Sequence, residues 1–306
     1  MQLTILDQGT HPLQKPDWLK LKMQPTWAFN SIKQTIKELE LHTVCEEAHC
    51  PNQNECWSSG TATFMVLGDT CTRACKFCNI KTGFPGKPVD QTEPKRLAQA
   101  VKQWNLDYVV ITSVDRDDLA DQGSTHFANC IAEIKKQRPE TIIEVLIPDF
   151  RGSMACLDRI INAKPDVIAH NIEVVKELQK TARDPRANYT QSLAVLEYPK
   201  LVNPEIVTKT SIMLGLGETR SEVIELMQDL LDHKVDILTI GQYARPSPKH
   251  LPVIEYVHPD TFKFYEKQAL EMGFKYCASG PFVRGSYKAR DVFDSLLNKN
   301  HLMTTI

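Results

Sequence analysis

Short apolar runs recur along most of the chain, separated by amphipathic stretches with a helical period. The runs are rich in Val, Ile, Leu and Phe and cover residues 64–68, 107–114, 141–148, 166–173, 207–215 and 236–241. They are nearly continuous in apolar residues rather than alternating, which is typical of strands buried on both faces of a parallel sheet. The pattern therefore predicts repeated strand–helix units joined by crossover connections.

The stretches between these runs carry the apolar faces of helices. The clearest faces are formed by Val223, Leu226, Met227, Leu230 and Leu231, and by Phe127, Cys130, Ile131 and Ile134. In both sets the apolar positions recur three or four residues apart and so line one side of a helix. We interpret Cys130 and Cys156 as core thiols on such faces, and Cys277 as a structural cysteine.

The predicted fold is an α/β fold: a partial six-stranded (β/α)6 barrel, similar to a TIM barrel, with extensions at both ends of the chain. A closed barrel typically uses about 250 residues for eight units, whereas residues 61–275 carry six here. A doubly wound sheet is the alternative. Residues 1–60 are the predicted N-terminal extension, with a helix near 31–42, and residues 276–306 are the C-terminal extension.

Composition narrows the class of protein. A chain of 306 residues with 42% hydrophobic content can build a core without disulfides. Its 36 basic and 38 acidic side chains give a net charge of −2, which offers no support for a nucleic-acid partner. No apolar run approaches the roughly 20 residues of a membrane span, and the first residues resemble neither a secretory signal nor a transit peptide. We predict a cytoplasmic protein without nucleic-acid or membrane partners.

Six of the nine cysteines lie between residues 45 and 78, in two triplets. In a reducing compartment, clustered thiols usually bind metal or act in catalysis rather than forming disulfides. Cys71, Cys75 and Cys78, the downstream triplet, have the spacing Cys-x3-Cys-x2-Cys and follow the first predicted strand. In a β/α barrel this loop lies at the mouth, where active sites are built.

Three thiolates on one loop can hold three irons of a 4Fe–4S cluster and leave the fourth iron open to a chelating cofactor. Structural zinc is the alternative, but zinc usually takes four ligands from facing cysteine pairs. Cys45, Cys50 and Cys56, the upstream triplet, have the spacing Cys-x4-Cys-x5-Cys without a fourth cysteine nearby. They predict a second cluster; His49 adjoins Cys50 and is kept only as a secondary candidate ligand.

The downstream triplet, with Phe77 before its last cysteine, resembles the motif of the radical S-adenosylmethionine superfamily. The resemblance implies that the open iron binds the amino and carboxylate groups of S-adenosylmethionine. An electron from the cluster would cleave the sulfonium and release a 5′-deoxyadenosyl radical, which removes hydrogen from an unactivated C–H bond. The cofactor carries this step, while the barrel supplies positioning and excludes water.

The two triplets together resemble the lipoyl synthase family, with similarity from about Trp18 to Ala289. The resemblance is carried by VCEEAHCPNQNECW, GDTCTRACKFCNIKTG, ITSVDRDDLADQG, HNIEVV, MLGLGET, DILTIGQY and SGPFVRGSYKA. It implies that the upstream triplet holds an auxiliary 4Fe–4S cluster whose fourth ligand is the second serine of an Arg-Ser-Ser-Tyr motif. Here the motif is Arg284-Gly285-Ser286-Tyr287, so Ser286 keeps the ligand position and Gly285 departs from the pattern.

The resemblance also implies the reaction and the partners. The enzyme would be a sulfurtransferase that inserts sulfur from the auxiliary cluster at C6 and C8 of an octanoyl chain, using two molecules of S-adenosylmethionine. A serine oxygen is a harder ligand than a thiolate and should release iron more easily. The octanoyl chain would be held on a lysine of a lipoyl carrier domain, as in 2-oxoacid dehydrogenase acyltransferase subunits and the glycine cleavage H protein. Flavodoxin or ferredoxin would supply electrons, and the terminal extensions are candidate docking surfaces.

Polar residues at the ends of other strands are further candidates. By resemblance, Asn171, Glu173 and Arg183 look like contacts for S-adenosylmethionine, with Arg183 on its carboxylate. Asn171 and Glu173 are two residues apart, so both can face the barrel interior; solvated side chains at a strand end are the alternative. The loop DRDD (115–118) could assist the site, but a solvated turn is its default interpretation.

Two other functions compete with this interpretation. A methylthiotransferase acting on tRNA also uses two clusters, but it usually carries its auxiliary cysteines in a separate N-terminal domain and needs a basic RNA-binding domain. An electron carrier with two clusters usually gives every iron a protein ligand and needs no barrel. Each triplet leaves one iron of a cluster without a cysteine ligand, and the chain is long enough for a barrel. Both features favour lipoyl synthase activity.

Overall fold

The computed structural model describes residues 14–19, 27–48, 50, 52–58, 63–286, 289–290 and 293. Its main feature is an eight-stranded sheet with the order β1-β2-β5-β6-β7-β8-β9-β10. Strand β1 (His42–Thr43) is antiparallel to β2, and every other neighbouring pair is parallel. The parallel strands are β2 (Thr63–Val66), β5 (Tyr108–Ser113), β6 (Ile142–Leu146), β7 (Val167–Ala169), β8 (Val207–Leu214), β9 (Ile237–Gln242) and β10 (Tyr276–Gly280).

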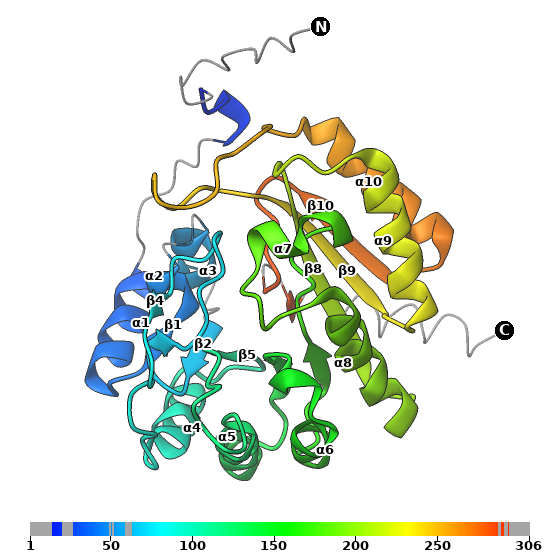
Figure 1. Ribbon diagram of the computed structural model, residues 1–306. Coiled ribbons are helices and arrows are strands. Elements are labelled where there is room, and N and C mark those ends of the chain that lie inside the picture. Colours follow the sequence, from blue (N-terminus) through cyan, green and yellow to red (C-terminus); the bar gives the residue numbers. More distant parts are fainter. Residues whose placement is uncertain are drawn as a thin grey trace, which may run out of the picture.

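The sheet curves into an open barrel with helices around its outside (Figure 1). Within the described residues, β1 and β10 end the sheet without pairing with each other. The prediction of a partial barrel is therefore confirmed, and all six predicted runs form strands of it. The predicted number of six strands was too low, because β1 and β10 also belong to the sheet. The outer helices are α4 (Glu93–Gln103), α5 (Ser124–Gln137), α6 (Met154–Asn162), α8 (Tyr189–Val202), α9 (Arg220–Asp232) and α10 (Pro259–Met272).

Burial explains why the strands are apolar throughout. Every residue of β2 and of β9 is buried, because the helices cover one face and the barrel interior covers the other. The predicted face of α9 is confirmed: Val223, Leu226, Met227 and Leu230 are buried, and Leu231 lies half-buried at its edge. A capping box starts this helix, since the Thr219 hydroxyl and the Glu222 carboxylate each accept the backbone N–H of the other residue.

Smaller elements complete the chain. The helix predicted near residues 31–42 is α1 (Trp27–Glu38), which ends earlier because residues 42–43 pair with β2. The remaining elements are η1 (Asp17–Leu19), α2 (Val44–Glu47), α3 (Gln53–Ser58), β3 (Thr70–Cys71), β4 (Lys81–Thr82), η2 (Phe150–Gly152), η3 (Lys176–Leu178) and α7 (Gln179–Ala182). None of the described helices has the length and apolar character needed to cross a membrane.

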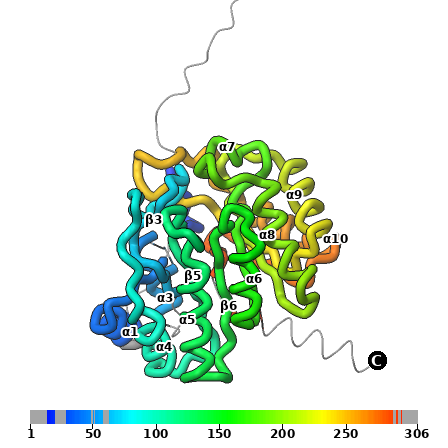
Figure 2. Tube along the Cα trace, turned by 60° about the horizontal axis from the view of Figure 1, so that its bottom comes forward, coloured from blue at the N-terminus to red at the C-terminus, as the bar shows by residue number. Residues whose placement is uncertain are grey.

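Two connections bring distant parts of the sequence to the barrel mouth. The segment between β9 and α10 runs beside the loop of the downstream triplet (Figures 1 and 2). There the backbone N–H of Leu251 donates to the carbonyl of Lys76 at 3.1 Å, and Nε2 of His250 donates to the carbonyl of Cys78 at 3.0 Å. The segment after β10 instead reaches the upstream triplet, where Asn52 Nδ2 donates to the carbonyl of Phe282 at 2.6 Å.

A glycine on β9 permits the close approach of the segment after β10. A Cβ added at Gly241 would lie 2.0 Å from the carbonyl oxygen of Val283, closer than any real contact allows. Strand β10 itself was not expected, since residues 276–280 fell in the predicted C-terminal extension. The division into residues 1–60, 61–275 and 276–306 stays a prediction.

Candidate functional site

The downstream triplet lines a cavity of about 250 Å³ at the carboxyl ends of the strands. The same wall contains all three residues predicted to contact S-adenosylmethionine, namely Asn171, Glu173 and Arg183. The loops after β2 and β7 supply these two groups, and they meet because parallel strands end at one edge of a barrel. Much of the remaining wall is apolar and includes Val44, Met65, Ile80, Val114, Leu146 and Ile147.

The thiols of the downstream triplet are partly buried. Burial raises the pKa of Cys71 and Cys78 to about 12 and that of Cys75 to about 11. Two sulfur atoms accept backbone hydrogen bonds: Arg73 N–H donates to Cys71 Sγ at 3.4 Å and Asp184 N–H donates to Cys75 Sγ at 3.3 Å. Because iron binds the thiolate form, metal binding here must release protons.

The thiols of each triplet surround a space. Across the part of the chain that the structure describes, no group of three or more His, Cys, Asp or Glu side chains converges as the ligands of a single metal ion do. In a 4Fe–4S cluster each cysteine binds a different iron, so the ligands stand around a volume. The lining of the cavity by all three sulfur-bearing residues is compatible with such a cluster.

Asn171 and Glu173 follow β7, which ends at Ala169 and is shorter than the predicted strand. Glu173 has a φ of 69°, which is uncommon for a residue with a side chain. Backbone bonds on both sides hold this conformation: its N–H donates to Ser211 O at 3.1 Å, and its carbonyl accepts from Met213 N–H at 2.8 Å. Burial raises the pKa of the Glu173 carboxyl, against the opposing effects of Arg183 and of a hydrogen bond from Asn171. The alternative of solvated side chains at this strand end does not describe Glu173.

Arg183 is buried and oriented by a hydrogen-bond relay that the sequence did not reveal. Its Nη1 donates to Ser192 Oγ at 2.8 Å and to Gln179 Oε1 at 3.2 Å. The Ser192 hydroxyl donates to Nε2 of His170 (2.9 Å), whose Nδ1 donates to Ile147 O (2.9 Å). Burial and the charge of Arg183 lower the pKa of His170 to about 4, so its ring is neutral. Nε of Arg183 is buried without a partner among the described residues, which leaves a donor for a ligand.

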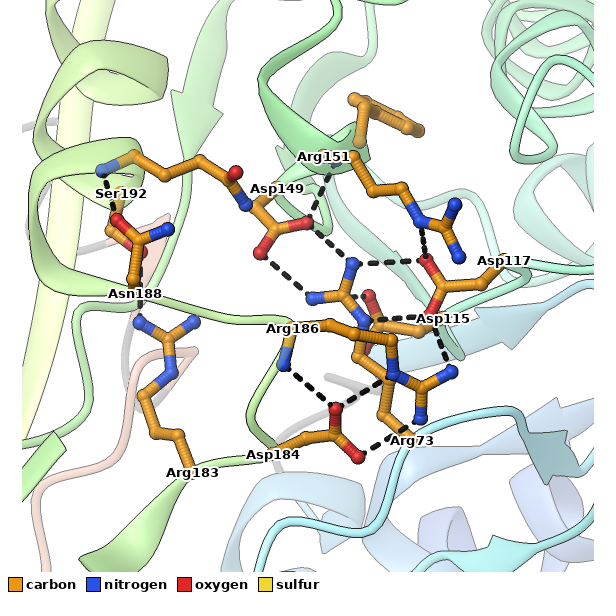
Figure 3. A network of polar contacts seen from close by, with 12 residues as sticks. Arg73, Asp115, Asp117, Asp149, Arg151, Arg183, Asp184, Arg186, Asn188 and Ser192 are labelled. Carbon is orange, nitrogen blue, oxygen red and sulfur yellow. Dashed lines mark hydrogen bonds and ion pairs between the residues drawn. The ribbon is translucent and has the colours of Figure 1, made fainter. Parts of the chain in front are cut away.

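The DRDD loop corrects our default interpretation of a solvated turn. Arg116 is 2% exposed, and the side chain of Asp117 is 1% exposed. The loop is drawn inward because buried arginines pair with its carboxylates, as Figure 3 shows around Arg73. Asp115 lines the cavity with its Oδ2 3.8 Å from Cys71 Sγ. Burial raises the pKa of Asp115 to about 6, although the charge of Arg73 opposes the rise.

The upstream triplet lines a second, much smaller cavity of about 20 Å³. Ser286 lies in the same wall, and its Oγ accepts a hydrogen bond from the hydroxyl of Thr63 at 2.9 Å. The structure therefore brings together Cys45, Cys50, Cys56 and Ser286. The wall also includes Asn52 and Arg284. The secondary candidate His49, like Tyr287 of the serine motif, lies outside the described residues.

Burial also raises the pKa values of the upstream thiols. It raises the pKa of Cys45 to about 11 and that of Cys56 to about 12. It raises the pKa of Cys50 as well, while a backbone hydrogen bond and the guanidinium of Arg284 act in the opposite direction. Cys277, a residue of β10, is buried in the core, as expected for a structural cysteine. Cys130 and Cys156 are likewise buried.

The two cavities are neighbours. Val44 and Ala48 line the downstream cavity, while Cys45, between them in sequence, lines the upstream one. Gly285 precedes Ser286, and a Cβ added to it would lie 3.5 Å from Oδ1 of Asn171. Residues in and directly after α2 therefore contribute to both walls, and the segment around Gly285 lies beside a residue of the downstream wall.

Solved structures share the fold. The hydrogenase maturase HydG from Carboxydothermus hydrogenoformans superposes with a TM-score of 0.54, covering 88% of this chain and 68% of its own at 13% identity. Streptococcus suis SuiB, solved with S-adenosylmethionine, gives 0.53, covering 72% of this chain and 52% of its own at 10% identity. At these identities the similarity concerns the fold alone.

Sequence comparison is more specific. The family model of the radical SAM superfamily matches residues 65–230, and that of the N-terminal domain of lipoyl synthase matches residues 4–50. The apicoplast lipoyl synthase of Plasmodium knowlesi is 54% identical over 92% of this chain, which spans 64% of that relative's length. The mitochondrial lipoyl synthase of Picea sitchensis is 50% identical over 94% of this chain and 77% of its own. The chain therefore belongs to the lipoyl synthase family within the radical SAM superfamily.

Proposed function

We propose that the chain is a lipoyl synthase, a sulfurtransferase that inserts two sulfur atoms at C6 and C8 of an octanoyl chain. The observation that carries the proposal is the pair of adjacent cavities, each lined by three cysteines, of which only one has room for a ligand. Relatives at about half identity bear the name lipoyl synthase. This pairing supports a division of labour between a cluster that handles a cofactor and a cluster that donates sulfur.

The superfamily implies 4Fe–4S clusters and S-adenosylmethionine, and the residues of the downstream cavity fit both. Cys71, Cys75 and Cys78 offer three thiolates, which leave one iron free. The unpaired Nε of Arg183 suits a carboxylate. An ammonium group beside Glu173 would oppose the effect of burial on its carboxyl, because a nearby cation lowers a carboxyl pKa. When bound, S-adenosylmethionine supplies the radical chemistry; the chain positions it and excludes water.

In the upstream cavity, Cys45, Cys50, Cys56 and Ser286 would hold the auxiliary cluster that provides sulfur. The Thr63 hydroxyl donates to Ser286 Oγ, so it can stabilise the serine oxygen once that oxygen loses its proton and binds iron. Arg284 adds a positive charge beside Cys50, which offsets part of the negative charge of thiolate ligands. A serine ligand remains weaker than a thiolate for iron, as a cluster that is consumed requires.

The substrate would be an octanoyl chain on a lysine of a carrier domain. The apolar part of the downstream wall suits an alkyl chain. We propose as partners the acyltransferase subunits of 2-oxoacid dehydrogenases, the glycine cleavage H protein, and flavodoxin or ferredoxin as electron donor. The candidate docking surfaces on the terminal extensions lie partly outside the described residues.

We also propose the cytoplasm as the compartment, on the sequence argument alone. The relatives compared above are named as apicoplast and mitochondrial proteins, which gives this prediction no support. Fractionation of the native cells followed by immunodetection of the chain would test it, and recovery with an organelle fraction would contradict it.

The function is tested by anaerobic turnover of the reconstituted chain with an octanoylated carrier domain, S-adenosylmethionine and a reductant. We expect mass spectrometry to find two sulfur atoms added to the carrier, with two 5′-deoxyadenosine formed per product. Deoxyadenosine without sulfur on the carrier would contradict the substrate, and methylthiolated tRNA would favour the methylthiotransferase. Absence of deoxyadenosine from a reducible two-cluster protein would favour the electron carrier.

A further inference from the structure

Arg73, inside the loop of the downstream triplet, is buried and forms hydrogen bonds to two carboxylates at once, with a third carboxylate, that of Asp115, 3.4 Å from its Nη1 (Figure 3). Its Nη1 and Nη2 donate to the two oxygens of Asp149, each at 2.7 Å. Its Nε and Nη2 donate to the two oxygens of Asp117 at 2.8 and 3.0 Å. A single guanidinium thus forms two bidentate, charge-assisted pairs, an arrangement that lysine cannot reproduce.

The network extends beyond Arg73 and joins four loops. Asp117 also accepts from Arg151 Nε at 3.0 Å and lies 3.1 Å from Arg186 Nη1. Arg186 in turn pairs with both oxygens of Asp184, at 2.8 and 2.9 Å. We call this set the loop lattice: Arg73, Asp117, Asp149, Arg151, Asp184 and Arg186. Its members come from the loops after β2, β5, β6 and β7.

Two residues of the loop lattice form backbone hydrogen bonds to cysteine sulfur atoms. The backbone N–H of Arg73 is the donor to Cys71 Sγ, and the backbone N–H of Asp184 is the donor to Cys75 Sγ. Asp184 is tied to the cysteine loop a second time, because its Oδ2 accepts from the N–H of Ala74 at 2.9 Å. Hydrogen bonds to the sulfurs of an iron–sulfur cluster are among the features that set its reduction potential.

Stability alone does not explain so many buried charges. Buried ion pairs often contribute no more to folding than apolar residues of the same volume, because desolvation offsets their attraction. Burial acts to raise the pKa of Asp117 and Asp149, yet the hydrogen bonds and charge of Arg73 hold both below the usual value. The loop lattice therefore stays fully charged beside thiols that are themselves to carry negative charge.

We propose that Arg73 is a positioning residue that sets the reduction potential of the cluster on the downstream triplet. It does so by fixing the N–H groups of Arg73 and Asp184 on Cys71 and Cys75. Each N–H···S bond stabilises the reduced, more negative cluster, so losing them lowers the potential and slows reductive cleavage of S-adenosylmethionine. The inference rests on the proposed function, because it requires a cluster on these thiols.

The experiment compares Arg73→Lys with a matched control, Arg116→Lys. Arg116 is also buried and pairs with both oxygens of Asp118 at 2.9 Å, but its third recorded partner is the carbonyl of Leu67 rather than the cysteine loop. Both variants are made in the full chain and in a background with Cys45, Cys50 and Cys56 changed to Ala, so that one cluster titrates. Iron content, thermal unfolding, the midpoint potential by electron paramagnetic resonance, and deoxyadenosine formation are measured.

We expect both substitutions to lower thermal stability and to leave the cluster in place. Only Arg73→Lys should lower the potential, with about tenfold less reduced cluster at a fixed poise, equivalent to about 59 mV for one electron. A stronger reductant should restore its deoxyadenosine formation. An unchanged potential in Arg73→Lys, or an equal shift in Arg116→Lys, overturns the inference while the proposed function stands.

Two further outcomes keep the test decisive. A parent chain whose downstream triplet holds no reducible cluster overturns both the inference and the proposed function. If Arg73→Lys does not fold, Asp184→Asn replaces it, since this variant keeps the shape of the side chain but loses the anionic acceptor of Ala74 N–H and Arg186. It should shift the potential in the same direction by a smaller amount, and no shift overturns the inference.

Discussion

Each cysteine triplet offers three thiols, but the residues around the two triplets differ. The upstream thiols enclose a cavity of about 20 Å³, with a serine hydroxyl from the other end of the chain in its wall. The downstream thiols line a cavity of about 250 Å³ that also contains Asn171, Glu173 and Arg183. The first space is closed tightly by its wall, whereas the second leaves room for a cofactor. The walls, rather than the cysteine count, therefore distinguish the two roles.

The two sites also differ in how they are assembled. The downstream thiols share one loop, which the loop lattice ties to its neighbours. The upstream thiols come from α2, the connection between α2 and α3, and α3 itself. The segment that carries Ser286 packs closely on β9 at Gly241, where a side chain would clash with it. The upstream site should therefore be sensitive to changes in the segment after β10, whereas the downstream site depends on the loops after β5, β6 and β7.

Removing the downstream thiols should have the largest effect. Changing Cys71, Cys75 and Cys78 to Ala deletes every protein ligand that we assign to that cluster, so we expect loss of about four irons per chain. Cleavage of S-adenosylmethionine should stop, and with it sulfur insertion. Iron analysis and chromatography of 5′-deoxyadenosine measure both. A variant that keeps eight irons or still forms deoxyadenosine would contradict the assignment.

Removing the upstream thiols should abolish sulfur insertion but leave the cleavage of S-adenosylmethionine intact. With Cys45, Cys50 and Cys56 changed to Ala, the downstream loop keeps its ligands, so deoxyadenosine should still form from S-adenosylmethionine. No lipoyl product should appear, because the proposed sulfur source is gone. Mass spectrometry of the carrier provides the measurement, and detection of lipoyl groups would remove the sulfur-donor role from this triplet.

Gly241→Ala should affect the upstream site from a distance. The added methyl would meet the carbonyl of Val283 at 2.0 Å, so the segment carrying Ser286 must move away from β9. Overpacking of this kind costs about 1–3 kcal/mol of stability. We expect the upstream cluster to bind less iron and sulfur insertion to fall by about tenfold or more, while deoxyadenosine formation is largely kept. Equal loss of both activities would mean that the barrel as a whole is damaged.

The parts predicted correctly from sequence are those fixed by local pattern. The strands could be recognised because burial on both faces leaves an apolar run, and the triplets because their ligands are close in sequence. Ser286 is different, since it came from family resemblance: no local feature of "RGSY" signals that it meets Thr63. Strand β10 was missed because "YCASG" is short and ends in glycine, and its pairing depends on β9.

The buried charges show where local inference fails. Charged residues usually lie at the surface, so "DRDD" was interpreted as a solvated turn. Burial of Asp117 depends on Arg73, 44 positions away, and burial of Arg73 depends on Asp149, 76 positions away. These residues become partners because their loops meet at the barrel mouth. The pattern of residues along the sequence does not show which loops meet. The relay of Arg183, Ser192 and His170 was missed for the same reason.

Changes at Ser286 should be milder and should test the ligand itself. Ser286→Ala removes the oxygen but leaves the segment in place, so sulfur insertion should weaken while deoxyadenosine formation is retained. Ser286→Cys should hold the cluster more tightly and slow sulfur release, because a thiolate suits iron better than an oxygen ligand. Thr63→Val, which removes only the hydrogen bond to Ser286, should give a smaller loss. Iron-edge spectroscopy that finds water as the fourth ligand, or sulfur from Cys277, would contradict the assignment.

Gly285→Ser, which restores the family residue, should have the smallest effect and tests how far the two cavities are independent. A Cβ here would lie 3.5 Å from Asn171 Oδ1 and 3.7 Å from Ser211 Cβ, both ordinary contacts. The site therefore has room, and we expect both activities to stay within about threefold of the parent, or less than ~0.7 kcal/mol. Gly285→Ala is the control for the added bulk. If serine but not alanine slows cleavage of S-adenosylmethionine, its hydroxyl must disturb Asn171 in the downstream cavity. The two sites would then be coupled through this position, and the glycine would keep them apart.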